Sequence, residues 1–397
     1  MILAGPSPRR RFPQRCLATL LTGALVLTGT PADAGRVPLI SAEPDQTVGF
    51  DGLVYASTHV GDTVYLGGNF THAIVDGKEV ARKRLAAVDA RTGRLLPWAP
   101  LLDDTVLALT ASGGNLYVTG EFTTVAGQPR AGLAAINLTT AAVSPLKHTI
   151  KGVGQAITVA DGRLYVGGSF TAVNGRTARN LAAFRLSDGA VDTGFQGGTD
   201  GKIQALTATG PRLYVGGAFR KLNGTDASAR LGALRLADGK LDTGFRPQAP
   251  YPVFGLTIAA DKIYAAVAGA GGRVAAYQPD GKLVWSSVTD GDVQAITYLN
   301  GAVYAGGHFT VACPQPSRDA KAWCPTKKMR PQPKMAAWDP NNGALLGWNP
   351  RSNGKWGVLT MKANPKLRTV TVGGDFTAFG TASRPRFAQF RASGYGA

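Results

Sequence analysis

The residues best suited to binding chemistry are basic side chains that recur just before an apolar run, once in each of seven stretches of the chain. The seven positions are Arg84, Arg130, Arg179, Arg230, Arg273, Lys334 and Arg386. Guanidinium and ammonium groups bind carboxylates and phosphates, so seven of them on one face would form a ring suited to an anionic partner. The alternative is that each cation pairs with a nearby acidic group and only fixes a loop.

A second basic group lies in residues 311–334, where six cations accompany one acid, Asp319. The cations are Arg318, Lys321, Lys327, Lys328, Arg330 and Lys334. Trp323, Lys327, Lys328 and Arg330 are therefore further candidate binding residues. Cys313 and Cys324 lie in the same segment, and two cysteines in an exported chain are expected to pair. The prolines of this segment leave disorder open as an alternative.

Catalytic chemistry has weaker support. Four polar residues follow glycine pairs, or a threonine-glycine pair, at corresponding positions: Asn69, Glu121, His308 and Asp375. They are weak candidates for a cation or acid-base site, although so mixed a set is typical of solvated strand ends. The histidines lack the spacing of a zinc site, and no nucleophile is paired with a base in the sequence. We therefore predict no catalytic residue, no metal and no cofactor.

The elements that position these residues follow from one repeated phrase, Tyr-Val-Gly-Gly-x-Phe-Thr. Copies begin at positions 65, 117, 165, 214, 264, 304 and 371, and the copy at 264 is degenerate. Intervals of this size are typical of repeats that each form one small β-sheet. Four strand patterns per repeat and seven repeats predict an all-β, seven-bladed β-propeller.

The third repeat shows the expected strands most clearly, at residues 153–159, 163–170, 181–186 and 190–195. Asp161-Gly162 and Asp188-Gly189 are predicted to form the tight turns between them, because Asp followed by Gly tolerates positive φ. In a propeller, the loops that join second and third strands share a face with the links between blades. The basic residues and the 311–334 insertion fall on those loops.

The two ends of the folded region are predicted to meet. The last repeat ends after its third strand at residues 386–391, and residues 37–52 have the pattern of a missing fourth strand. We expect this N-terminal strand to close the ring and leave no free inner edge. Residues 35–397 then form one domain, and we expect a monomer.

Residues 1–34 have the features of an export signal: a basic start, an apolar stretch and the cleavage pattern Ala32-Asp33-Ala34. Arg9-Arg10-Arg11-Phe12 also resembles a twin-arginine signal. The chain carries 43 Lys and Arg, 25 Asp and Glu and a net charge of +18, and removal of residues 1–34 leaves about +15. No segment has the 18 uninterrupted apolar residues of a membrane span, so a secreted protein is predicted.

Several phrases together resemble a known family. They are Leu-Tyr-Val-Gly-Gly-x-Phe-Thr, Asn174-Gly175 with a basic residue, Leu181-Ala182-Ala183-Phe184 and Thr193-Gly194-Phe195. This pattern resembles the delta-sixty repeat β-propellers of exported bacterial proteins over nearly the whole mature chain. The resemblance implies the fold but no catalytic signature. The fifth repeat departs from it by lacking Gly-Gly-x-Phe, and the sixth by its insertion.

These observations predict a non-enzymatic binding module. The expected partner is an anionic polymer, an acidic glycan or a protein at the cell surface, bound through the basic loop face. Nucleic acid is also negatively charged and would bind the same basic face, but an exported chain rarely meets it. The alternative is an extracellular lyase or hydrolase with its site at the pore mouth, for which the four polar residues are the only support.

Overall fold

The computed structural model describes residues 38–392, and almost all regular structure in that range is β-strand. The helical element there is one short 3-10 turn, η1 (Thr326–Lys328). Among these residues no helix is long and apolar enough to cross a membrane. The expected export signal at residues 1–34 lies outside the described residues.

Each repeat forms an antiparallel sheet whose three main strands follow one another in the chain. In the first four repeats these strands are β2 (Val54–Val60), β3 (Thr63–Gly68) and β6 (Leu85–Asp89); β7 (Val106–Ser112), β8 (Asn115–Gly120) and β11 (Leu133–Asn137); β12 (Ile150–Ala160), β13 (Arg163–Val173) and β15 (Leu181–Arg185); and β16 (Ile203–Thr209), β17 (Arg212–Gly217) and β18 (Leu231–Arg235). In the last three they are β19 (Val253–Ala259), β20 (Lys262–Val267) and β21 (Arg273–Tyr277); β23 (Val293–Leu299), β24 (Ala302–Gly307) and β27 (Met335–Trp338); and β28 (Val358–Asn364), β29 (Thr369–Gly374) and β32 (Phe387–Arg391). The predicted first three strands of the third repeat are confirmed to within a few residues.

Short strands decorate the loops between the second and third strands. They are β4 (His72–Val75) and β5 (Lys78–Ala81), with β1 (Gly49–Phe50) beside β4; β9 (Thr124–Val125) and β10 (Gln128–Pro129); β14 (Arg176–Thr177), which pairs with β13; β25 (Val311–Ala312) and β26 (Arg330–Pro331); and β30 (Ala378–Phe379) and β31 (Ala382–Ser383). Because these loops carry the predicted basic residues, their hairpins determine where those side chains lie.

The prediction of four full strands per repeat is wrong for most repeats. Only the fifth repeat has a regular fourth strand among the described residues, β22 (Leu283–Val288). In the third repeat the predicted strand 190–195 is reduced to one bridge, between Phe184 and Val191. The same single bridge occurs at the corresponding place in the first, second, fourth and sixth repeats. In the third repeat, Asp192 follows the bridge and accepts from Arg163 Nε and from the Gly194 amide.

The N-terminal residues divide between two sheets. Ile40 forms a bridge with Ala392, and Asp45 N–H donates to the Gln389 carbonyl at 2.7 Å, so this part lies beside β32. β1 instead pairs with β4 of the first repeat. The prediction that residues 37–52 form one continuous fourth strand is therefore wrong, although their first half does occupy the outer side of the last sheet.

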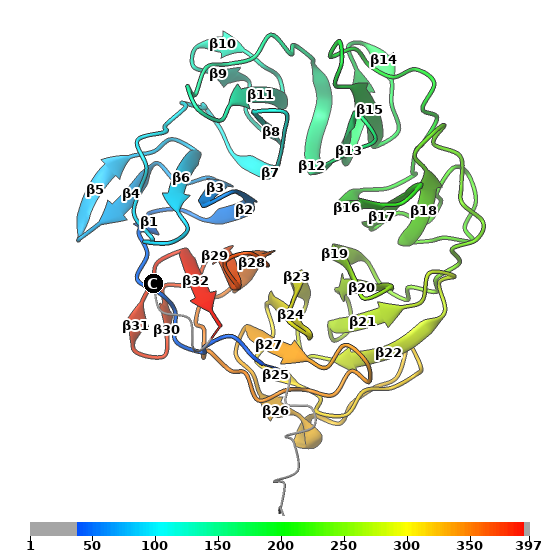
Figure 1. Cartoon of the computed structure of the whole chain (residues 1–397). Coiled ribbons are helices and arrows are strands. Elements are labelled where there is room, and N and C mark those ends of the chain that lie inside the picture. The colour runs from blue at the N-terminus through cyan, green and yellow to red at the C-terminus, as the bar shows by residue number, and fades with distance from the viewer. Residues whose placement is uncertain (1–37, 393–397) are drawn as a thin grey trace, which may run out of the picture. The chain divides into compact units, whose positions relative to one another are not determined.

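The first strands lie nearest the centre of Figure 1. Each contacts the first strand of the next repeat, and β28 of the last repeat contacts β2 of the first. All seven strands line one central cavity of about 150 Å³. In every first strand the pairing register skips one residue near the start, such as Tyr55 between Val54 and Ala56. These bulges place one side chain per repeat at the cavity wall.

The paired glycines allow close packing at two contacts. A side chain at Gly67 would meet Val106 of the next repeat at 2.6 Å, and one at Gly68 would collide with the Leu53 carbonyl. In the second repeat, Thr119 stands at the first glycine position and Gly154 of the next repeat makes room for its side chain. These contacts support the structural interpretation of the repeated phrase, since they leave no space at the glycines for a ligand.

In five of the seven repeats, an aspartate or asparagine in the link before the first strand caps the residue that ends the repeated phrase. Asp51 accepts from the Thr71 and His72 amides at 2.8 and 3.0 Å, and from the Thr71 hydroxyl. The same cap occurs with Asp103 on Thr123, Asp200 on Arg220, Asp290 on Thr310 and Asn353 on Thr377. Burial alone would raise the pKa of Asp51, but these hydrogen bonds outweigh it and lower the pKa to about 2. The pKa values of Asp103 and Asp290 are lowered in the same way.

These caps predict an acid-sensitive fold. A carboxyl whose pKa is lower in the folded state stabilises the fold above about pH 4, and loses that contribution as the pH falls toward about 2. The triple variant Asp51→Asn, Asp103→Asn and Asp290→Asn should keep the amide acceptors, as natural Asn353 does. Its melting temperature should therefore fall less between pH 5 and pH 2 than that of the wild type. An equal fall in melting temperature for the two proteins between pH 5 and pH 2 would contradict this prediction.

Candidate functional site

The seven predicted basic residues do not occupy equivalent positions. Arg84, Arg230, Lys334 and Arg386 take the residue before the third strand, with φ between 67° and 73°. In the second and third repeats that position belongs to Gly132 and Asn180, which also have positive φ. At each of these positions the carbonyl accepts from the second glycine of the phrase, and the amide donates to the phenylalanine carbonyl. The position therefore has a backbone role in the loop.

Three of the guanidinium groups bind backbone carbonyls of their own repeat. Arg84 donates to the Asn69 carbonyl, and Arg386 donates to the Asp375 carbonyl. Arg130 is 6% exposed and donates to the carbonyls of Pro129 and Ser144 at 2.7 and 3.0 Å. The cations thus fix loops, as the alternative interpretation required, but through carbonyl groups and not through carboxylates.

Two more of the seven are enclosed by the protein. Arg273 is 2% exposed, donates to the Ala322 carbonyl at 3.0 Å and lies 5.3 Å from the centre of the Tyr251 ring. Lys334 is 9% exposed. A ring of seven available charges is therefore not present. Within residues 38–392, Arg179 and Arg230 are the two of the seven whose side chains are neither buried nor hydrogen-bonded to the chain.

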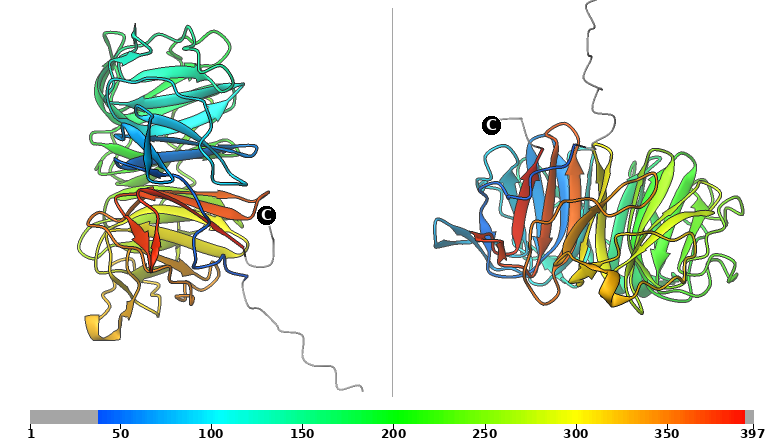
Figure 2. Two further views of the ribbon diagram at one scale, coloured as in Figure 1. Left: turned by 90° about the vertical axis from the view of Figure 1, so that its left-hand side faces the viewer. Right: turned by 90° about the horizontal axis from the view of Figure 1, so that it is seen from below.

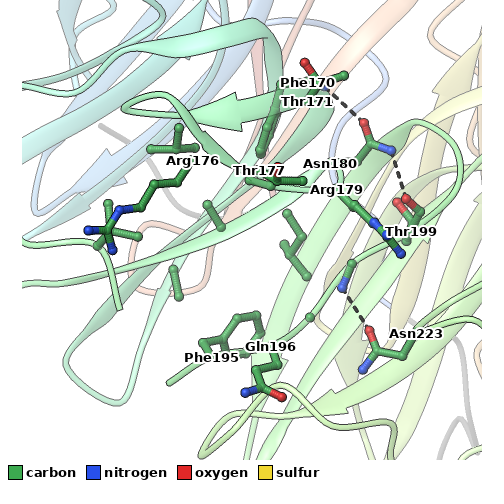
Figure 3. Close-up of a pocket in the computed structure, with 18 of the residues that line it drawn as sticks. Phe170, Thr171, Arg176, Thr177, Arg179, Asn180, Phe195, Gln196, Thr199 and Asn223 are labelled. Carbon is green, nitrogen blue, oxygen red and sulfur yellow. Dashed lines mark hydrogen bonds between the residues drawn. The ribbon is translucent and has the colours of Figure 1, made fainter. Parts of the chain in front are cut away.

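Arg179 borders a recess of about 980 Å³ between the sheets of the third and fourth repeats (Figure 3). Its wall carries three further cations, Arg176, Lys221 and Lys240. None of the four forms an ion pair within the described part of the chain. The structure thus gathers one predicted residue, Arg179, with three cations that are not among the predicted ones. A signal for Arg176 exists in the sequence, because a basic residue after Asn174-Gly175 is part of the repeat pattern.

The two acids of the recess are already engaged. Asp192 pairs with Arg163, with Nε and Oδ2 2.6 Å apart, and this hydrogen bond is the main cause that lowers the pKa of Asp192. Asp200 accepts from the amides of Arg220 and Lys221, both at 2.8 Å. Neither carboxylate pairs with Arg176 or Arg179. The recess has four cations and these two acids, so it presents net positive charge to solvent.

Two asparagines hold the wall of the recess in place (Figure 3). Asn180 accepts from the Phe170 amide at 3.0 Å and donates to the Thr199 carbonyl at 3.1 Å, which ties the third repeat to the next link. Asn223 accepts from the Gly198 amide at 2.8 Å. The recess is therefore pre-formed, and its cations can bind anionic groups without a rearrangement of the backbone.

The insertion at residues 311–334 is attached to the neighbouring sheet of the fifth repeat. Ser317 and Ser286 of β22 exchange two backbone hydrogen bonds of 2.8 Å, and the Cys313 amide donates to Val288 at 2.8 Å. The predicted disulfide between Cys313 and Cys324 is confirmed, with the two Cα atoms 6.1 Å apart. Figure 2 shows η1 projecting from the edge of the sheets at this point. Buried Arg273 anchors the insertion through Ala322 and is therefore a structural residue.

The remaining cations of the insertion face solvent. Those that are exposed are Arg318, Lys321, Lys327, Lys328 and Arg330. The ion pairs of residues 38–392 include none of them, and Asp319 instead accepts from the Lys321 amide at 2.8 Å. Trp323 is 64% exposed and lies over Gly271 of the fifth repeat. The insertion therefore combines unpaired positive charge with one exposed aromatic ring on a tethered loop.

The disulfide should hold this loop in shape. By the chain-entropy argument, closing a loop of this length stabilises the folded state by about 3 kcal/mol. The double variant Cys313→Ser and Cys324→Ser should lower the unfolding free energy by about that amount, and trypsin should cleave it faster after Lys327 and Lys328. Equal cleavage rates for variant and wild type in non-reducing buffer would show that β22 alone fixes the loop.

The four polar candidates for a cation or acid-base site have separate roles. Asn69 accepts from the Leu53 amide at 2.7 Å, and Asp375 accepts from three amides of the link before β28. Glu121 is exposed, and the His308 ring lies 5.7 Å from the Trp356 ring. No group of three His, Cys, Asp or Glu in the described part of the chain could hold a metal ion. None of these contacts joins two of the four residues.

Comparison with known proteins agrees with this geometry. The family described as "Domain of unknown function (DUF5122) beta-propeller" matches residues 160–195. The crystal structure of the WD40 β-propeller domain of Doa1 is 11% identical and has a TM-score of 0.56 over 90% of this chain and 98% of that one. The computationally designed Ika8 protein is 12% identical, with a TM-score of 0.53 over 88% and 100%.

The fold is a β-propeller. At this level of identity the two structures show the fold alone. No curated protein matches the chain significantly. The description of the matched family does not name delta-sixty repeats, so that resemblance stays a prediction. The match covers residues 160–195 of the third repeat, whose copy of the phrase is the most regular.

Proposed function

We propose that this β-propeller is an exported binding module that docks an anionic polymer, an acidic glycan or an acidic protein surface through the basic residues of its loops. The observation that carries the proposal is the exposed, unpaired positive charge of the insertion, at Lys321, Lys327, Lys328 and Arg330. A cation that is not paired with a carboxylate of its own chain breaks no ion pair when it binds an external anion.

The basic recess of the propeller adds a second point of attachment. Arg176 and Arg179 flank a concave wall, whereas the cations of the insertion lie on a projecting loop. A polymer that reaches both gains avidity, because the second contact forms within one complex. The proposed partner is therefore extended and carries repeated negative charges.

The proposed fold is a closed ring of seven blades made by a monomer. Two observations support it: β28 contacts β2, and Ile40 with Asp45 lies beside β32 at the outer side of the last sheet. Export is supported by the signal-like residues 1–34 and by the disulfide, since disulfides persist in oxidising compartments. An exported module of this kind meets wall polymers and glycans far more often than nucleic acid.

A binding array tests the function. Wild type and the triple variant Lys327→Ala, Lys328→Ala and Arg330→Ala are applied to immobilised acidic polysaccharides, polyphosphate and neutral glycans at two ionic strengths. The proposal predicts that the wild type is retained on the acidic polymers at low salt, and that both high salt and the triple variant reduce retention. Equal retention on neutral glycans would contradict it.

A further inference from the structure

The link between the sixth and seventh blades is longer than its counterparts. In four other repeats the capping aspartate precedes the first buried residue of the next strand by three positions: Asp51 and Val54, Asp103 and Val106, Asp200 and Ile203, Asp290 and Val293. The corresponding pair in the last blade, Asn353 and Val358, is five positions apart. Lys355 and Trp356 lie in this longer segment, so the link differs from the others in both length and chemistry.

The backbone of this link is held firmly. The Asp375 carboxylate accepts from the amides of Lys355, Trp356 and Gly357 at 2.9, 2.8 and 2.6 Å. Asp375 is itself 9% exposed, and Arg386 donates to its carbonyl oxygen. The side chains of the link are therefore displayed from a fixed base, which reduces the conformational entropy that ligand binding costs.

The displayed side chains form a small aromatic and cationic platform. The Trp356 side chain is 49% exposed, although large apolar side chains are otherwise mostly buried in residues 38–392. The His308 ring lies 5.7 Å from the Trp356 ring at an angle of 41°, and Lys355 Nζ lies 5.2 Å from the centre of the indole. His308 also lies three residues before the basic insertion, so one member of the platform is close to the insertion in the sequence.

We propose that Trp356, Lys355 and His308 form a subsite that stacks one pyranose ring of an acidic glycan. One face of a pyranose presents several C–H groups with partial positive charge, and the face of an indole ring carries the complementary negative charge. The Lys355 ammonium then binds a carboxylate or sulfate of the same sugar, and His308 bonds to a hydroxyl group. This inference rests on the proposed function and narrows its ligand to a carbohydrate.

A single ring favours a sugar over single-stranded nucleic acid. Proteins that bind single strands without sequence preference stack successive bases on several aromatic side chains along a basic groove. Here the other exposed tryptophan, Trp323, belongs to the insertion and is not part of the same ring cluster. One isolated platform with one adjacent cation fits one acidic sugar unit.

The test measures binding of full-length mature protein to four probes: the trimer of galacturonic acid, maltotriose, polyglutamate and oligothymidylate. The Trp356→Ala variant should bind the acidic trimer at least 10-fold more weakly than the wild type, and should lose the change in tryptophan fluorescence that binding causes. Trp356→Phe should retain part of the affinity, and Lys355→Ala should lose affinity for the acidic trimer but not for maltotriose. Leu101→Ala, which alters another exposed apolar side chain, should have no effect.

The outcomes separate this inference from the proposed function. Polyglutamate should bind wild type and Trp356→Ala equally, since it engages charge without stacking. If the wild type binds polyglutamate but not the acidic trimer, or if Trp356→Ala binds the trimer as the wild type does, the platform is refuted and the proposed function stands. If oligothymidylate loses more affinity than the trimer in Trp356→Ala, the platform binds bases instead. If no anionic probe binds, both proposals fail.

Discussion

Deletion of residues 35–47 should lower the melting temperature of the mature protein by about 10 °C or more. Ile40 is 3% exposed in the core of the last blade, and its amide donates to the Tyr304 hydroxyl at 3.1 Å. Removing one buried isoleucine costs about 2 to 3 kcal/mol in lost apolar burial. The deletion also exposes the edge of β32 and leaves buried polar groups without partners, which adds to the loss.

Asp45 makes most of the polar contacts between the N-terminal residues and the last blade. Its carboxylate accepts from Gln389 at 2.8 Å and pairs with Arg391 at 3.2 Å, and its carbonyl accepts from Arg384 at 2.7 Å. The point variant Asp45→Ala should therefore reproduce part of the effect of the deletion. A protein that lacks only residues 1–34 is the reference for both measurements.

The deletion of residues 35–47 tests whether the N-terminal residues help to close the ring. The deletion stops before Val48 and Phe50, which are buried in the first blade, so that blade keeps its core. Thermal unfolding followed by circular dichroism gives the comparison. A melting curve unchanged by the deletion would show that the last blade is stable without its N-terminal partner, and would remove the support that residues 38–47 give to closure.

Charge reversal on the insertion should have the largest effect on binding. In the variant Lys327→Glu, Lys328→Glu and Arg330→Glu, three attractive contacts with an anionic polymer become repulsive. At about 1 kcal/mol for each cation near an anionic surface, the affinity at low salt should fall by more than about 100-fold. Fluorescence anisotropy with a labelled acidic oligosaccharide measures the loss.

A matched control separates local contacts from net charge. Lys78, Arg94 and Lys366 are exposed and form no ion pair among the described residues. The variant Lys78→Glu, Arg94→Glu and Lys366→Glu changes the net charge by the same amount at other places. It should weaken binding far less than reversal on the insertion. Equal losses would mean that only the overall charge matters, and that the insertion has no special role.

The elements of this fold were predictable where they depend on local sequence. The first three strands of the third repeat are close to the expected residues, because Asp161 and Gly162 both take positive φ and fix the hairpin. The pairing of Cys313 with Cys324 was also expected. The fourth strand was not predictable in most repeats, because its length depends on pairing with the third strand of the same sheet. In five repeats that pairing is reduced to one bridge, such as the one between Phe184 and Val191.

The candidate site was less predictable because its side chains are long. The sequence placed Arg84, Arg130 and Arg386 on loops, but it could not show that their guanidinium groups turn back to carbonyl oxygens. The recess next to Arg179 forms only where two repeats meet, so no pattern within one repeat reveals it. The sequence does carry a signal for the caps: an aspartate stands 20 residues before the end of the phrase at Asp51, Asp103, Asp200 and Asp290.

The dependence of affinity on salt is the decisive test of docking through the basic insertion. Equilibrium binding of the wild type to one acidic polysaccharide is measured between low and physiological ionic strength, beside the charge-reversed insertion variant. Docking through the basic insertion predicts that the logarithm of the wild-type association constant falls steeply and linearly with the logarithm of the salt concentration, and that the variant gives a shallower slope. A wild-type affinity that does not change with salt, or identical slopes for the two proteins, would contradict docking through the basic insertion.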